Sequence, residues 1–378
     1  MTAERPPSFR PVVAEVDLDA VRANVATLLS CAGGAALMAV VKAGGYGHGA
    51  VEVARAALDA GATWLGVALV EEGAELRAAG IDAPILLLSE PPIGAASAVV
   101  AERLTPVVYR APYVDALAKA AEAAGVDRLA VHLKVDTGMH RVGCTLEEAE
   151  PLARKVAWRG PLYLEGVMTH LAVADEPGNP LTGVQLQRFE DVLSQLTSGG
   201  NAPDVVHAAN SAATIAVPEA RYDLVRCGIA VYGIAPAPVM EGSAPLRPAM
   251  RLRAEVAHVQ RLPAGEGISY GQHYRLERES TVAVVPAGYA DGVARRLFEV
   301  GGEVLIGGQR HPVAGAVTMD QFMVDCGDAD VAPGDEVVIL GRQGGEEITA
   351  NEIAARLGTI GYEITCAVGP RVPRVHVG

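Results

Sequence analysis

The sequence predicts an N-terminal (β/α)8 barrel followed by a mostly antiparallel β domain, both within one chain of 378 residues. Short apolar runs alternate with alanine-rich amphipathic stretches from residue 38 to about residue 228, which gives eight strand–helix units. Eight units close a barrel, whereas an open doubly wound sheet would fit five or six as naturally. Beyond about residue 247 the apolar residues recur with a period of two, which is typical of antiparallel strands.

The eight barrel strands are expected where apolar runs are continuous, because helices cover both faces of a parallel sheet. These runs are 38–41, 64–69, 84–89, 105–109, 129–136, 163–170, 203–210 and 222–228. Between them, stretches such as 111–125 place Val114, Leu117 and Ala118 at helical spacing. Residues 11–18 would form a ninth strand, one more than the barrel needs, so this strand is expected to join the β domain.

A segment rich in proline and small residues, 235–248, precedes the β domain. The stretches "MRLRAEVAHVQ", "STVAVVPAG", "EVLIGG" and "DEVVILG" follow as expected strands. One helix is predicted by Thr349 and Glu352, which form a capping box, with Gly358 at its end. We therefore expect an N-terminal segment over 1–13 that joins the β domain, a barrel over 14–247 and a β domain over 248–378.

Composition narrows the classes of function. A net charge of −14 and a pI near 5.1 argue against a broad surface for nucleic acid or acidic membranes. No run approaches about 18 apolar residues, and the first eleven residues carry no apolar signal core. Five scattered cysteines without a CxxC pair indicate reduced thiols. The expected location is the cytoplasm.

Polar side chains gather where the barrel strands end, which is where barrels place their active sites. Five of the eight strands lead into such groups: Lys42; Asp136 and Arg141; His170; Asn210 and Ser211; and Arg226, Cys227 and Gly228. Each has an ordinary explanation alone, such as a solvated lysine, a core histidine, a salt-bridged arginine or a helix cap. Their convergence on one rim favours a functional site.

A phosphorylated cofactor fits this rim. Ser211 opens a helix, and its hydroxyl with nearby N–H groups suits an anion, while Gly228 allows a close backbone approach. Barrels commonly hold phosphate after strands seven and eight. Lys42 would face the other end of the cofactor, with its pKa lowered by neighbouring cations and burial. Pyridoxal 5′-phosphate (PLP) combines a phosphate with a covalent link to lysine.

Eight motifs in order extend this interpretation: "AVVKAGGYGHG", "DTGMHRVG", "MTHLAVAD", "HAANSAAT", "DLVRCGIAVYG", "ISYGQHY", "PAGYADG" and "TMDQF". Together they resemble the alanine racemase family, fold-type III PLP enzymes, from about residue 12 to residue 375. The resemblance implies a racemase that interconverts L- and D-alanine and supplies D-alanine for peptidoglycan. It also implies a head-to-tail homodimer with two shared sites, and no nucleic-acid or membrane partner.

The resemblance assigns roles to individual residues. Lys42 would carry PLP, and Tyr289 of the partner subunit would be the second acid–base. The remaining cofactor contacts would come from Tyr46, Arg141, His170, Asn210, Ser211, Arg226, Gly228, Ile229 and Tyr362. Arg141, with Met319 and Asp320 of the partner subunit, would line the substrate pocket. Lys134 matches a lysine that is carbamylated in some relatives, and an ordinary salt bridge there is an equal alternative.

The chain departs from the family pattern at two places. Gly44–Gly45 stands where the family usually has Asn-Ala, and two glycines are expected to loosen the loop at about 1 kcal/mol of ordering entropy. Thr318 stands where cysteine is common.

The implied mechanism uses two bases on opposite faces of the substrate. Arg226 can donate a hydrogen bond to the cofactor ring but cannot protonate it, which disfavours decarboxylation and transamination. An ordinary tyrosine titrates near pH 10, so an alkaline optimum is expected.

Alternatives remain open at this point. A PLP-barrel amino-acid decarboxylase shares the two-domain plan, but would place a carboxylate where Arg226 stands. A PLP-carrier barrel would leave residues 248–378 without a role. A metal-dependent hydrolase could use His170 and Asp136 but lacks a second paired histidine. A racemase of broader specificity is a further alternative, because pocket shape depends on loops from two chains.

Overall fold

The structure is a computed structural model that describes residues 9–378. The chain folds as two compact units, one made of 21–45 and 49–247, the other of residues up to 20 together with 46–48 and 248–378. Each unit is described by itself below. The first eight residues, which include most of the segment predicted over 1–13, lie outside the described part of the chain.

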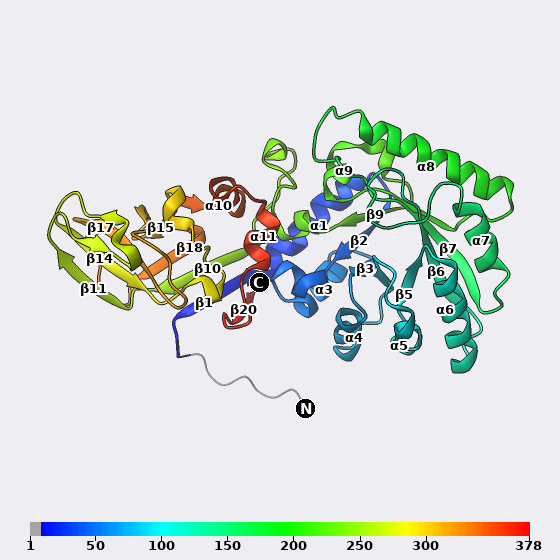
Figure 1. The fold of residues 1–378 in the computed structure, drawn as a ribbon, viewed down its shortest axis with the longest axis horizontal. Coiled ribbons are helices and arrows are strands. Elements are labelled where there is room, and N and C mark those ends of the chain that lie inside the picture. The colour runs from blue at the N-terminus through cyan, green and yellow to red at the C-terminus, as the bar shows by residue number, and fades with distance from the viewer. Residues whose placement is uncertain (1–8) are drawn as a thin grey trace. The chain divides into compact units, whose positions relative to one another are not determined.

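The first unit is a barrel of eight parallel strands in the order β8-β7-β6-β5-β4-β3-β2-β9 (Figure 1). The strands are β2 (Ala36–Val40), β3 (Trp64–Val67), β4 (Ile85–Leu87), β5 (Thr105–Val108), β6 (Leu129–Lys134), β7 (Leu162–Met168), β8 (Val205–His207) and β9 (Leu224–Cys227). β9 pairs in parallel with β2, which brings the last strand back to the first. The prediction of an eight-stranded barrel is confirmed.

Individual hydrogen bonds span the seam between β8 and β9. The Asp223 amide donates to the Val206 carbonyl at 3.1 Å, and the Arg226 amide donates to the Ala209 carbonyl at 2.9 Å. Buried apolar side chains from five strands of the barrel pack together in one cluster. This cluster is Met38, Leu86, Val107, Met168 and Leu224.

Helices surround the strands on the outside of the barrel (Figure 1). They are α1 (Leu18–Ala32), α3 (Ala50–Asp59), α4 (Val70–Ala78), α5 (Ala96–Ala101), α6 (Ala111–Ala124), α7 (Ala149–Ala157), α8 (Leu181–Ser198) and α9 (Ser211–Ala216). In α6 the predicted inward residues Val114, Leu117 and Ala118 are buried, and Gly125 ends the helix in a left-handed conformation. The expected helical period is therefore the observed one.

The second unit is built on strands that are mostly antiparallel. Its largest sheet has the order β16-β15-β18-β10-β1-β20, with β19 also paired to β18. These strands are β1 (Val12–Asp17), β10 (Met250–Glu255), β15 (Glu303–Ile306), β16 (Gln309–Pro312), β18 (Glu336–Gln343), β19 (Glu346–Ile348) and β20 (Arg374–Val377). β1, from the start of the chain, lies between β10 and β20. The antiparallel prediction is confirmed, with β1–β20 as a parallel pair.

Two smaller sheets complete this unit. One has the order β11-β14-β17, and the other pairs β12 with β13. The strands are β11 (His258–Leu262), β12 (Gly267–Ile268), β13 (Tyr274–Arg275), β14 (Ser280–Val285) and β17 (Phe322–Gly327).

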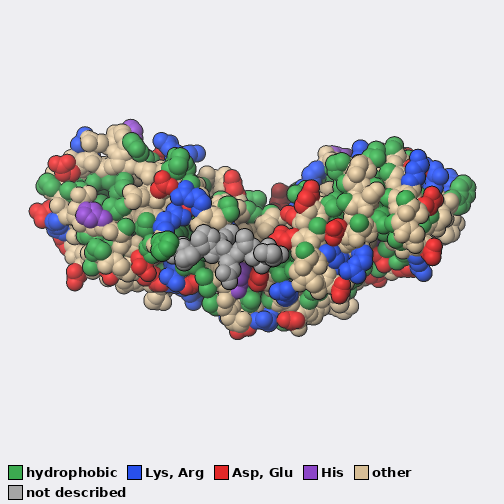
Figure 2. Space-filling model, turned by 90° about the horizontal axis from the view of Figure 1, so that it is seen from below, with side chains coloured by type: hydrophobic (Ala, Val, Ile, Leu, Met, Phe, Trp, Pro, Cys, Tyr) green, Lys and Arg blue, Asp and Glu red, His purple; other side chains and the backbone are tan. Residues whose placement is uncertain are grey.

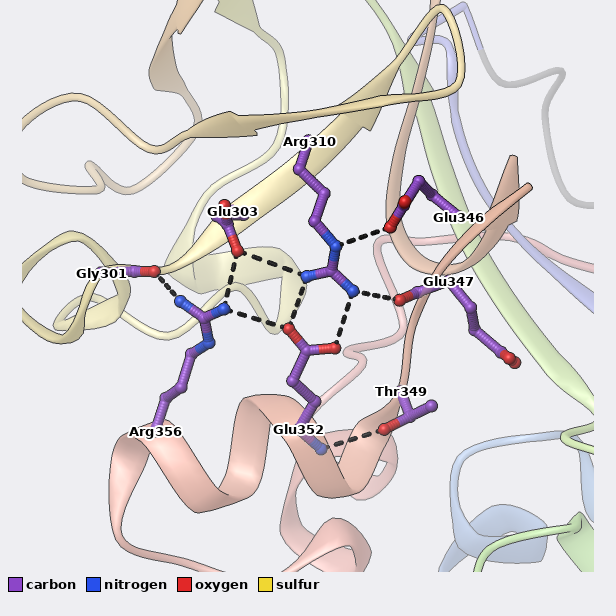
Figure 3. A network of polar contacts seen from close by, with 8 residues as sticks. All are labelled: Gly301, Glu303, Arg310, Glu346, Glu347, Thr349, Glu352 and Arg356. Carbon is purple, nitrogen blue, oxygen red and sulfur yellow. Dashed lines mark hydrogen bonds and ion pairs between the residues drawn. The ribbon is translucent and has the colours of Figure 1, made fainter. Parts of the chain in front are cut away.

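Two helices accompany the sheets, α10 (Ala350–Leu357) and α11 (Gly361–Cys366). Thr349 caps α10 by accepting the Glu352 amide at 3.0 Å, and Gly358 ends it in a left-handed conformation, so both predicted ends of the helix are confirmed. The predicted capping box is only half formed, because the Glu352 carboxylate binds arginines instead of the Thr349 amide. The Glu352 carboxylate binds Arg310 and Arg356, and both arginines also bind Glu303 (Figure 3). The helix start is thereby tied to β15 and β16 by a network of charges.

Candidate active site

Lys42 follows the end of β2 by two residues and is partly buried. The chain after it, α2 (Lys42–Tyr46), turns in the left-handed sense, with φ of 54° at Ala43, 61° at Gly44 and 63° at Gly45. This conformation costs an ordinary residue about 1–2 kcal/mol and costs glycine almost nothing. The two glycines, expected from the sequence to loosen the loop, therefore occupy positions where glycine has the least strain.

Hydrogen bonds hold this left-handed turn in place. The Gly45 amide donates to the Val41 carbonyl at 2.9 Å, which closes one turn. The Ala43 amide donates to Glu72 at 2.6 Å, and the other oxygen of Glu72 accepts the Ala68 amide at 2.8 Å. The base of the Lys42 side chain is consequently anchored to the start of α4.

Lys42 belongs to a cluster of cations at the carboxyl ends of the strands. Burial, followed by repulsion from Arg226, Arg141 and Lys42, lowers the pKa of Lys134 to about 7. The Lys134 amine donates to the Leu88 carbonyl at 2.9 Å. Burial, together with the same cations and Lys134, also holds the pKa of His170 well below its ordinary value. An anionic ligand would relieve this repulsion.

Arg226 is the most firmly held member of the cluster, and its residue is 3% exposed. One guanidinium nitrogen donates to the Thr169 and Ala208 carbonyls at 2.8 and 2.9 Å and lies 3.3 Å from Nδ1 of His170. Burial lowers its pKa to about 10, so it stays protonated at neutral pH. Its other terminal nitrogen lies 3.1 Å from Nδ1 of His207.

A network of hydrogen bonds links Arg226 on β9 to side chains on β8, β6 and β7. Nε2 of His207 lies 2.7 Å from Nδ1 of His132, and Nε2 of His132 lies 3.1 Å from Glu165. Arginine can only donate and a carboxylate can only accept, so each hydrogen bond of this network is donated in the direction of Glu165. Burial lowers the pKa of both histidines, which favours their neutral forms. Sequence reasoning missed these three residues, because a histidine inside an apolar run is typical of a barrel core.

Gly166 is the residue from which the sequence could have indicated this hydrogen-bond network. A Cβ on Gly166 would lie 2.4 Å from Nδ1 of His132, so the histidine ring occupies the space of a side chain on β7. A glycine inside an apolar strand indicates such a close approach.

Ser211 and Gly228 come together as predicted for an anion site. The Ser211 hydroxyl accepts the Gly228 amide at 2.9 Å and the Ala230 amide at 3.4 Å. Ile229 is buried and begins a 3-10 turn, so its amide has no partner within that turn. Asn210 accepts the Ala213 amide at 3.0 Å, which makes it the N-cap of α9 and a support for Ser211.

In the second unit, Tyr46 and Tyr362 lie together, with ring centroids 6.1 Å apart. A Cβ on the adjacent Gly47 would lie 2.2 Å from the Thr365 carbonyl, so this segment packs directly on α11. The Arg374 side chain also donates to the Gly47 carbonyl at 2.9 Å. Two residues assigned to one cofactor group are thus neighbours within this unit.

Tyr289 and Met319 form a further group in the second unit. The Tyr289 amide donates to the Thr318 carbonyl at 3.0 Å, and the Ala290 amide donates to the Met319 carbonyl at 3.1 Å. Tyr289 is 43% exposed and Met319 52% exposed, so both side chains are open to solvent in the single chain. Asp320, next in the chain, accepts a hydrogen bond from Arg371 at 2.7 Å.

The fold and the residues at the barrel rim together define a class of protein. It is a β/α-barrel enzyme in which a lysine lies among fixed cations, and this site suits an anionic ligand. Within residues 9–378 no group of three or more histidine, cysteine or acidic side chains is arranged to hold a metal ion. No helix of the same residues has the length and apolarity to cross a membrane.

Comparison with known proteins identifies the family. Residues 16–236 match the model for "Alanine racemase, N-terminal domain", and residues 249–376 match "Alanine racemase, C-terminal domain". The chain is 52% identical over 372 residues to the alanine racemase of Symbiobacterium thermophilum, which covers 98% of each protein. This chain belongs to the alanine racemase family, whose members are PLP-dependent isomerases.

Solved structures agree with this assignment. The alanine racemase from D-cycloserine-producing Streptomyces lavendulae has a TM-score of 0.94 at 46% identity, covering 98% of each chain. A histidine racemase from Leuconostoc mesenteroides has a TM-score of 0.90 at 28% identity, covering 98% of this chain and 99% of that one.

Proposed function

We propose that this chain is a PLP-dependent alanine racemase that interconverts L-alanine and D-alanine. The observation that carries the proposal is the cationic cluster around Lys42 at the barrel rim, in a chain that is similar to alanine racemases over almost its whole length. We further propose that it works in the cytoplasm and supplies D-alanine for peptidoglycan.

The residues present fit PLP. The Ser211 hydroxyl and the amides of Gly228 and Ile229 would hold the phosphate, the Gly228 amide by exchanging its hydrogen bond to Ser211 for one to the phosphate, with Tyr46 and Tyr362 as further contacts. Asn210 would support this site by fixing the start of α9. Arg226, immobilised by two carbonyls, would donate to the ring nitrogen, and Arg141 would meet the phenolic oxygen and the substrate carboxylate. His170 would support Arg226.

Two residues would move the proton. PLP, when bound, supplies an electron-withdrawing system that acidifies the α-hydrogen of the amino acid. Tyr289 of the partner subunit would take the α-proton from L-alanine, and Lys42 would take it from D-alanine. Met319 and Asp320 of the partner subunit would line the pocket. Tyr289 and Met319 are exposed in the single chain, which leaves both side chains accessible to a second copy in a head-to-tail dimer.

Lys134 carries a proposal of its own. A pKa of about 7 leaves much of its amine unprotonated at neutral pH, and a neutral amine can add to CO2 and release a proton, giving a carbamate. The carbamate would replace a buried positive charge by a negative one between Arg141 and Arg226. Growth of a carbonyl carbon signal after addition of ¹³C-bicarbonate, absent in Lys134→Met, would support it, and no difference between the two proteins would contradict it.

The proposed activity is tested by incubating the purified protein with L-alanine and PLP and following D-alanine by chiral chromatography. Borohydride reduction should fix a pyridoxyl group on the peptide that contains Lys42, and attachment to another lysine would contradict the assignment. Release of CO2 without D-alanine would favour the decarboxylase. A panel that includes histidine tests broader specificity, which the likeness to a histidine racemase makes worthwhile.

A further inference from the structure

Asp291 lies two residues after Tyr289 and its side chain is completely buried. Arg10, from the segment before β1, forms a two-point ion pair with it. Each terminal nitrogen of Arg10 donates to a different oxygen of Asp291, both at 2.7 Å. The paired residues are 281 positions apart in the chain and belong to the same unit. Such fork-to-fork contacts fix both distance and orientation.

The Asp291 carboxylate, held by Arg10, in turn stabilises the backbone turn that contains Tyr289. Asp291 accepts the Gly288 amide at 2.9 Å, and its own amide donates to the Gly288 carbonyl at 2.9 Å. A Cβ on Gly288 would lie 2.3 Å from the Thr318 and Met319 carbonyls, so this turn rests directly on the neighbouring loop. The backbone position of Tyr289 is therefore set by a turn of four residues, 288–291.

A second arginine joins the turn to the neighbouring loop. Nε of Arg371 lies 3.5 Å from Asp291, and its Nη2 donates to Asp320 at 2.7 Å. Asp291 is thus placed between two cations, of which Arg10 makes the closer contact. A buried carboxylate that loses its paired cation is strongly disfavoured, so removal of Arg10 should displace the turn.

We propose that Arg10 is a positioning residue for Tyr289: through Asp291 it fixes the turn that presents the tyrosine to the active site. This inference rests on the proposed function, because it assumes that Tyr289 exchanges the proton of L-alanine. A displacement of about 1 Å in an acid–base group can cost roughly 10²-fold in rate. Arg10 acts mainly through Asp291, with a longer hydrogen bond from its Nη1 to the Pro286 carbonyl at 3.4 Å, and is given no contact with substrate.

The first test measures amide hydrogen exchange of the full-length protein by mass spectrometry. Arg10→Met should speed exchange in the peptide containing 288–291 by at least about tenfold, because all four amides of this turn are hydrogen-bonded around Asp291 or to residues 318–319. The matched control is Arg261→Met, which removes a half-exposed arginine paired with Glu279 and Asp328 in the same unit. Equal protection of the peptide in both variants would overturn the proposal.

The second test uses an asymmetry that a general loss of stability does not produce. Enantiomers have equal free energy, so racemisation rates in the two directions stay linked whatever residue is damaged. Exchange of the α-hydrogen in deuterium oxide is not linked in this way. Arg10→Met should reduce exchange from L-alanine about tenfold or more relative to exchange from D-alanine, in the same sense as Tyr289→Phe, with Arg10→Lys intermediate.

The outcomes separate this inference from the function on which it rests. If Tyr289→Phe changes the ratio and Arg10→Met leaves it within about twofold of wild type, the positioning role is wrong and the proposed function stands. If neither variant changes the ratio, the role of Tyr289 is wrong and the inference falls with it.

A double variant covers the case in which Arg10→Met fails to fold. Arg10→Met with Asp291→Asn removes both charges and should restore folding, while the altered exchange ratio should remain because the two-point contact is gone. A stable double variant with the wild-type ratio would show that Arg10 only neutralises Asp291, which contradicts the proposal.

Discussion

At the scale of single residues, Lys134 is a lysine at the barrel rim that is both buried and close to other positive charges. Its side chain is almost wholly removed from solvent and lies among three other cations, and its amine donates a hydrogen bond to one carbonyl. An unfolded lysine titrates near pH 10.4, so between about pH 7 and 10 the unfolded chain binds more protons than the folded one. This residue therefore makes stability rise with pH across that window.

The corresponding prediction concerns Lys134→Met in buffer free of CO2. The variant should be more stable than wild type at pH 7, by about 1–4 kcal/mol, because a buried charge is replaced by an apolar side chain of similar length. The advantage should shrink as the pH rises to 10, since the free-energy cost of keeping the folded lysine deprotonated falls as the pH approaches the unfolded pKa of about 10.4. Urea unfolding at pH 7 and pH 10 measures both quantities. A variant that is less stable at pH 7, or a difference that does not change with pH, would contradict the assigned pKa.

Residue-scale reasoning from the sequence found the groups that stand at strand ends and missed those that stand inside strands. Lys42, His170 and Arg226 could be predicted because each follows or ends an apolar run. His132 and His207 could not, because their contact depends on the register of β6, β7 and β8. Arg10 and Asp291 could not be paired either, since no local pattern links positions 281 residues apart.

At the scale of elements, the left-handed turn after β2 contains two glycines that are required for different reasons, backbone conformation and crowding. Gly44 and Gly45 both have φ near +60°, but a Cβ on Gly44 would meet nothing within 4 Å, whereas one on Gly45 would lie 3.2 Å from the backbone of Ala50. Backbone conformation alone therefore opposes a side chain at the first position. Conformation and crowding together oppose one at the second.

We predict that Gly44→Ala costs about 1 kcal/mol of stability and that Gly45→Ala costs more, about 2–3 kcal/mol. Gly94→Ala is the control, because Gly94 has open space around it and no positive φ. Guanidinium unfolding of the three variants gives the order directly. Equal costs at Gly44 and Gly45 would show that the turn can shift away from Ala50.

The charge network around α10 provides a second prediction at this scale. The hydrogen bond from Arg310, with Arg356 adding to it, holds the pKa of Glu352 below its ordinary value. A carboxylate with a lowered pKa contributes stability above about pH 4.3 and loses it as the pH falls. Glu352→Gln should cost about 1 kcal/mol at pH 7 and nothing near pH 2, as measured by urea unfolding. Glu299→Gln, at a more exposed pair with Arg296, should cost less at pH 7, and a similar cost would contradict the importance of the network.

At the scale of the whole molecule, the sequence predicted both parts of the fold from the change of hydrophobic period near residue 247. Strand and helix periods are local properties, so they could be recognised without contacts. The pairing of β1 with β20 joins the two ends of the chain and has no local signal. On the face shown in Figure 2, acidic and basic side chains are interspersed. The net charge of −14 therefore does not form a single negative patch on that face.

The central claim is that each active site takes Lys42 from one chain and Tyr289 from the other, and subunit mixing tests it most directly. Lys42→Ala and Tyr289→Phe are each expected to be nearly inactive. Random reassembly makes about half of the dimers mixed, each with one intact site of two, so about a quarter of wild-type racemisation should return if the sites act independently. Verified mixed dimers that stay as inactive as the parent variants would contradict the shared site and the placement of Tyr289 in it.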